Sequence, residues 1–69
     1  MTNTYRITSY EVRPLPFHTW TGEKWEVISH EGQDLQFFVH LTDALMHAEG
    51  VDRLDDLSTE ARQYWNQMA

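Results

Sequence analysis

The spacing of apolar side chains changes near the middle of this chain, and that change is the strongest constraint on its fold. Up to Val39, apolar residues tend to alternate with polar ones, as they do in strands that bury one face. From Leu41 onward they recur at intervals of three and four residues, which is the spacing of an amphipathic helix. The sequence therefore predicts an α+β domain in which the strands come first and the helices follow.

The length of the chain limits it to one small domain. Its 69 residues allow a single core over residues 1–69. It has no cysteine for a disulfide, but it has three Trp, three Tyr and three Phe, whose large side chains can enlarge a small core. A partner, either another protein or a second copy, is the other way for so short a chain to gain stability.

Three antiparallel strands are predicted, over Thr4–Val12, Lys24–Ser29 and Gln33–Val39. The alternation in the first strand changes parity near Ser9, which favours a β-bulge there. For the other two strands we expect a three-residue hairpin loop, residues 30–32, with Gly32 in the left-handed conformation.

That loop sets the register and so decides which side chains face the core. The register pairs Val27 with Leu35 and Trp25 with Phe37, and it turns these four residues and Val39 inward. Ile28 and Phe38 then lie on the outer face of the sheet. Depending on the bulge, Tyr10 and Val12 join them there.

Two helices are predicted after the strands. Thr42 is the expected N-cap of the first, which carries an apolar stripe and ends at Gly50. Ser58 caps the second, over Thr59–Met68, and the connector contains one helical turn pinned to the core by Val51, Leu54 and Leu57. The predicted fold is a three-stranded antiparallel sheet with both helices on one face, in the order β-β-β-α-α.

The segment between the first two strands, Arg13–Gly22, cannot be a central strand because it contains Pro14 and Pro16. It nevertheless carries Leu15, Phe17 and Trp20. Two alternatives remain open: this loop folds back over the protein, or it is an exposed apolar loop that docks into a partner.

The net charge of −6 makes some partners improbable. Nucleic acids and anionic membranes are bound through basic patches, whereas the five basic residues of this chain are scattered. A basic protein is the partner that this charge favours. The sequence shows no signal peptide or membrane-spanning stretch, so a cytoplasmic protein is expected.

No pattern of residues indicates catalysis or cofactor binding. There is no cysteine and no glycine-rich phosphate loop, and the histidines His18, His30, His40 and His47 lack the spacing of metal ligands. We therefore expect a protein that is not an enzyme and holds no metal or cofactor.

The function that the sequence favours is binding to another protein. The expected contacts are the outer sheet face, with help from the loop: Tyr10, Val12, Phe17, Trp20, Ile28 and Phe38. A second expected contact is the acidic segment between the helices, with Asp52, Asp55 and Asp56.

In size and charge the chain resembles small acidic phage-encoded inhibitors, which implies that it blocks a basic, nucleic-acid-handling complex. The alternative is a self-associating, homodimeric domain that binds a small molecule. In that case the slot, between sheet and helices or between two copies, would be lined by aromatic side chains from Trp20, Trp25, Phe37, Tyr64 or Trp65.

Overall fold

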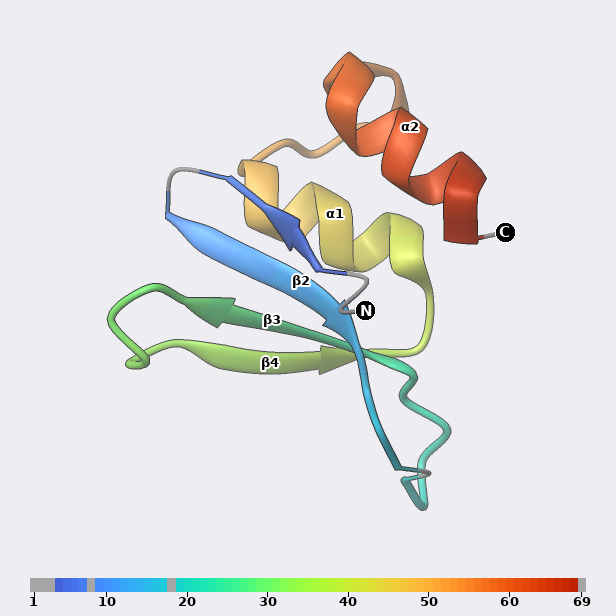
Figure 1. The fold of residues 1–69 in the computed structure, drawn as a ribbon. Coiled ribbons are helices and arrows are strands. Elements are labelled where there is room, and N and C mark those ends of the chain that lie inside the picture. Colours follow the sequence, from blue (N-terminus) through green and yellow to red (C-terminus); the bar gives the residue numbers. More distant parts are fainter. Residues whose placement is uncertain (1–3, 8, 18, 69) are drawn as a thin grey trace.

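The computed structural model describes residues 4–7, 9–17 and 19–68, and its architecture is α+β (Figure 1). An antiparallel sheet of four strands in the order β1-β2-β3-β4 is covered on one face by helices (Figure 1). The elements are β1 (Tyr5–Arg6), β2 (Tyr10–Pro14), β3 (Trp25–Ser29), β4 (Leu35–Phe38), α1 (Leu41–Glu49), the 3₁₀ helix η1 (Leu54–Asp56) and α2 (Thr59–Met68). The predicted antiparallel sheet followed by two helices is confirmed, but the sheet has four strands instead of three.

The additional strand arises where the apolar alternation changes parity. The chain reverses direction between Ile7 and Tyr10, and the Ile7 amide donates a hydrogen bond of 3.0 Å to the Tyr10 carbonyl. Tyr5 consequently pairs with Val12, so the segment predicted as one bulged strand forms the hairpin β1–β2. A bulge and a tight turn both change the parity of the alternation, which is why the pattern alone did not separate them. Thr8 lies outside the described residues.

The β3–β4 hairpin differs from the prediction by one residue of register. Its loop includes Gln33, so that Ser29 faces Asp34, and Trp25 pairs with Phe38 instead of Phe37. The Ser29 hydroxyl oxygen stabilises this longer loop because it accepts hydrogen bonds of 3.1 Å from the backbone amides of both Gln33 and Asp34. Gly32 has the predicted left-handed conformation, with φ of 74°.

This shift turns β4 over, because neighbouring residues of a strand point to opposite faces. Phe38, predicted on the outer face, packs against the core. Leu35, Phe37 and Val39, predicted inside, are 48%, 44% and 44% exposed. The predicted face of β3 is correct, since Val27 is buried and Trp25 packs against the core.

The core lies between the sheet and the helices. Val12, predicted on the outer face, is completely buried in it, and Tyr10 packs against it as well. The reversal of the chain between Ile7 and Tyr10 places both side chains on the inner face, so the outer-face prediction is wrong for them. The buried core residues are Val12, Val27, Leu41, Ala44, Leu45, Ala48, Leu57, Ala61 and Tyr64.

The helices begin and end close to where the sequence predicts. The first residue of α1 is Leu41, preceded by His40 as N-cap, so Thr42 lies within the first turn and is not the cap. Gly50 ends α1 in the left-handed conformation, with φ of 71°, as predicted. In the connector, Leu57 is buried, whereas Leu54 is 43% exposed and does not pin the chain to the core.

Candidate functional site

The loop between β2 and β3, residues 15–24 (hereafter the β2–β3 loop), projects away from the sheet and the helices (Figure 1). Its base continues the hairpin, because the Leu15 amide donates a 2.8 Å hydrogen bond to the Lys24 carbonyl. Near its tip, Gly22 has a φ of 84° and its amide lies 3.4 Å from the Thr19 carbonyl. The loop is therefore a turn with hydrogen bonds of its own.

Two large apolar side chains of this loop are open to solvent. Trp20 is fully exposed and Phe17 is 57% exposed. Of the two alternatives left open by the sequence, the structure excludes a loop that buries these rings against the protein. An exposed Trp and an exposed Phe in one loop lack the favourable burial of large apolar side chains, and interface hot spots are enriched in aromatic side chains, Trp above all.

The outer face of the sheet mixes cross-strand ion pairs with apolar residues. Arg6 pairs with Glu11 at 2.7 Å, and Arg13 pairs with Glu26. Of the four residues predicted to form a contact surface here, only Ile28 lies on this face, where it pairs with Leu35. The outer apolar stripe therefore consists of Ile28, Leu35 and Phe37.

The acidic segment between the helices is partly engaged within the protein. Asp52, Asp55 and Asp56 are exposed, as predicted, but basic groups lie close by. The Arg62 guanidinium donates a 2.8 Å hydrogen bond to the Asp55 carbonyl, and Arg53 lies 3.9 Å from the Asp55 carboxylate.

Glu49, the last residue of α1 before this segment, faces inward and joins three elements. Its carboxylate accepts hydrogen bonds from the Ser58 amide at 2.9 Å, the Ser58 hydroxyl at 2.6 Å and the Tyr5 hydroxyl at 2.9 Å. Ser58 in turn caps α2, because its oxygen accepts a 3.1 Å hydrogen bond from the Ala61 amide. Burial raises the pKa of Glu49, but the hydrogen bonds from Ser58 and Tyr5 outweigh it and lower the pKa below its ordinary value.

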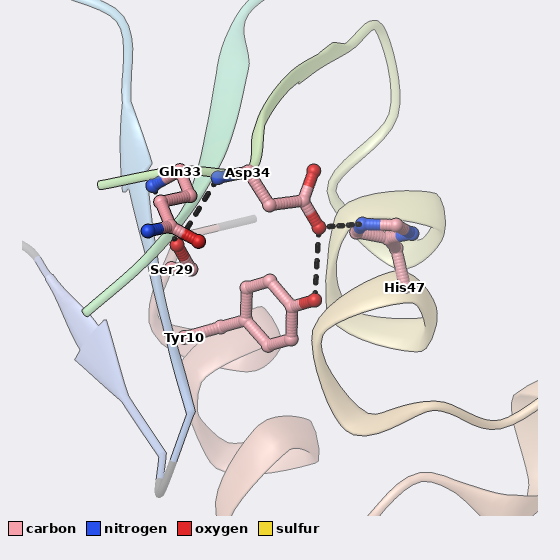
Figure 2. A network of polar contacts seen from close by, with 5 residues as sticks. All are labelled: Tyr10, Ser29, Gln33, Asp34 and His47. Atoms are coloured by element: carbon pink, nitrogen blue, oxygen red, sulfur yellow. Dashed lines mark hydrogen bonds and ion pairs between the residues drawn. The ribbon is translucent and has the colours of Figure 1, made fainter. Parts of the chain in front are cut away.

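A polar cluster that the sequence did not reveal joins β2, the end of the β3–β4 loop and α1 (Figure 2). The Tyr10 hydroxyl donates a 2.9 Å hydrogen bond to the Asp34 carboxylate, and this bond raises the pKa of Tyr10. His47 Nε2 lies 3.8 Å from the same Asp34 oxygen, and its ring packs against Tyr10 and Phe38. In the sequence, only Tyr10 pointed to this cluster. Its inward orientation could be predicted only if the β1–β2 turn was recognised.

The chemistry of this cluster is better suited to holding the fold than to catalysis. The Asp34 carboxylate accepts a hydrogen bond from the Tyr10 hydroxyl, and the nearby Ser29 hydroxyl oxygen accepts hydrogen bonds from two backbone amides. A groove of about 600 Å³ runs beside Tyr10 and His47, and it is lined largely by the β1–β2 turn and the end of α1. Within the described residues, no three or more His, Cys, Asp or Glu side chains are grouped to hold a metal ion, and His18 lies outside those residues.

The aromatic residues predicted for a small-molecule slot do not share one space. Trp25 and Tyr64 pack edge to face with ring centroids 6.3 Å apart, and so fill the gap between sheet and helices. Phe37 lies on the opposite face of the sheet, and Trp20 lies in the projecting loop.

Comparisons of this chain with protein-family models, with curated proteins and with solved structures returned no significant match. No helix within the described ranges has the length and apolar character needed to cross a membrane. The functional proposal therefore rests on the geometry of this chain alone.

Proposed function

We propose that this protein is a non-enzymatic interaction module that binds another protein through its β2–β3 loop, with Trp20 as the anchor. The observation that carries the proposal is the complete exposure of Trp20 at a turn that has its own hydrogen bonds. Because the loop is already folded back on itself, less conformational entropy is lost when it docks. Phe17, in the same loop, extends the apolar contact.

The partner that fits this loop is a protein with an apolar pocket in a basic surface. The pocket accommodates the indole and phenyl rings, and the basic surroundings complement the net charge of −6. Inhibition of a basic, nucleic-acid-handling complex is the specific form of this proposal. In that form the exposed Asp52, Asp55 and Asp56 speed the encounter through long-range attraction, and the loop supplies the affinity.

The proposal is tested on the partner once affinity capture has identified it and it has been purified. We expect Trp20→Ser to weaken binding by at least about 30-fold, the effect of losing an interface hot spot of about 2 kcal/mol. Leu54→Ser is the matched control, because Leu54 is also exposed but lies in η1. Calorimetric titration with the two variants measures both effects.

Two results would contradict the proposal. Equal affinity of the wild type and Trp20→Ser would show that the loop is not the anchor. Affinity that does not fall with rising salt would argue against a basic partner, because salt screens attraction between exposed charges. Thermal unfolding should be unchanged in Trp20→Ser, since this side chain is fully exposed in the isolated chain.

A further inference from the structure

The strand β4 forms one edge of the sheet, and its outward backbone groups are free to pair. The Ser29 amide donates to the Asp34 carbonyl, which fixes the phase of the β3–β4 ladder. In an antiparallel pair the hydrogen-bonded positions alternate, so Leu35 and Phe37 direct their amides and carbonyls away from β3. In the described part of the chain, no hydrogen bond from outside the ladder reaches these groups.

This edge lacks the features that usually prevent strands from pairing between molecules. The four residues of β4 include no charge and no proline, and Leu35 and Phe37 are half-exposed beside the open backbone. The opposite edge is different, because β1 has only two residues and one of them is the exposed, charged Arg6. The contrast points to β4 as an edge that a further strand covers.

We propose that the strand covering this edge is the β4 of a second copy, paired antiparallel with the two-fold axis at Gln36. Residues whose backbone groups face the edge must meet in hydrogen-bonded pairs, so Leu35 lies opposite the Phe37 of the second copy. This register pairs Leu35, Gln36 and Phe37 with the same three residues of the second copy. It also joins the stripes formed by Ile28, Leu35 and Phe37 of both copies into one apolar band across an eight-stranded sheet.

The distribution of charge is compatible with a second copy at this edge. Of the net charge of −6, residues 41–68 carry −4, from six acidic and two basic side chains. The acidic segment between the helices is tied to the far edge of the sheet, because Glu49 accepts its hydrogen bond from Tyr5 in β1. Two copies joined through β4 therefore keep their most acidic segments at opposite ends of the assembly.

Sedimentation equilibrium tests the proposal on the full chain. We expect the mass to rise from 8.2 kDa toward twice that value between about 10 µM and 1 mM, the range expected of a small, weak interface. Phe37→Lys places a charge on the edge and should keep the chain monomeric with an unchanged circular dichroism spectrum. Leu54→Lys, a charge at another half-exposed apolar site, should dimerise like the wild type.

The register is tested by disulfide cross-linking. Because the chain contains no cysteine, any disulfide must form at the introduced residue. At the two-fold axis the Gln36 residues form a pair that is not hydrogen-bonded, with Cα atoms about 4.5 Å apart, a distance that a disulfide spans. Gln36→Cys should therefore oxidise to a dimer at micromolar concentration, whereas Arg6→Cys on the other edge should not.

Three outcomes would overturn the proposal. The first is a wild type that remains monomeric up to 1 mM, and the second is a Phe37→Lys variant that still dimerises. The third is a Gln36→Cys variant that cross-links to another protein and not to itself, which would assign the edge to a foreign strand. Trp20→Ser should leave dimerisation intact, so failure of this proposal is distinguishable from failure of the proposed loop contact.

Discussion

Replacing Glu49 with Gln should destabilise the protein, because this carboxylate holds the start of α2 and the strand β1 against the end of α1. Glutamine keeps one oxygen that can accept from the Ser58 amide, but it loses the charge and one acceptor. Hydrogen bonds to a charged group contribute about 1.5–3 kcal/mol when buried, and partial exposure of the site reduces that value. We therefore expect a loss of about 1–2 kcal/mol in the free energy of unfolding.

Urea and thermal unfolding at pH 7 measure this loss. In a domain of this size each kcal/mol lowers the melting temperature by about 4–8 °C. Asp52→Asn is the matched control, because it removes the same charge from an exposed residue three positions further along the chain. That control should change the stability by less than about 0.5 kcal/mol.

The pH dependence follows from the lowered pKa of Glu49. A carboxyl whose pKa is lower in the folded than in the unfolded chain stabilises the fold above its unfolded pKa, and this stabilisation is lost as the pH falls through the folded pKa. The gap between the wild type and Glu49→Gln should therefore be largest at neutral pH and should narrow as the pH falls below the ordinary pKa of a glutamate. A gap that stays constant down to pH 3, or one no larger than that of Asp52→Asn, would refute this role of Glu49.

Four further substitutions test the β3–β4 register and the polar cluster. Phe38→Ser should lower the free energy of unfolding in urea by about 2–4 kcal/mol because Phe38 packs against the core, whereas Phe37→Ser should lower it by less than about 1 kcal/mol. A larger loss for Phe37→Ser than for Phe38→Ser would support the register expected from sequence instead. Ser29→Ala should cost about 1–2 kcal/mol because two backbone amides lose their acceptor, and a neutral effect would mean that the hydroxyl does not stabilise the loop. Asp34→Asn should bring the raised pKa of Tyr10 back toward 10, as followed by ultraviolet titration; the control is Tyr64, whose pKa burial raises to about 12 and which should not move.

The helices could be predicted from sequence because each of their signals is local. Gly50 ends α1 through its own backbone conformation, and Ser58 caps α2 through the amide of Ala61. The apolar stripe of α2 follows directly from the helical repeat, which accounts for the burial of Ala61 and Tyr64. These features depend on residues no more than four positions apart.

The faces of the sheet could not be predicted equally well, because they depend on counting residues across two turns. One additional residue in the β3–β4 loop placed Phe38 instead of Phe37 on the inner face. The signal for that residue was Ser29, whose hydroxyl accepts from two loop amides, but a serine at this position is equally compatible with a shorter loop. The polar cluster was missed for the same reason, since Tyr10, Asp34 and His47 meet only in the correct register.

The two proposed surfaces have a joint consequence that follows from strand direction. The β2–β3 loop leaves the sheet beside the end of β4, where Trp25 pairs with Phe38. In an antiparallel β4 pair these two ends point in opposite directions, so the two Trp20 side chains would project from opposite ends of the eight-stranded sheet. A dimer of this form cannot close both loops on one site of a partner. It would instead bridge two partner molecules, and the complex should contain two copies of each chain, whereas Phe37→Lys should reduce it to one of each without loss of intrinsic affinity. A complex of one partner molecule with two copies of the wild type would contradict this arrangement.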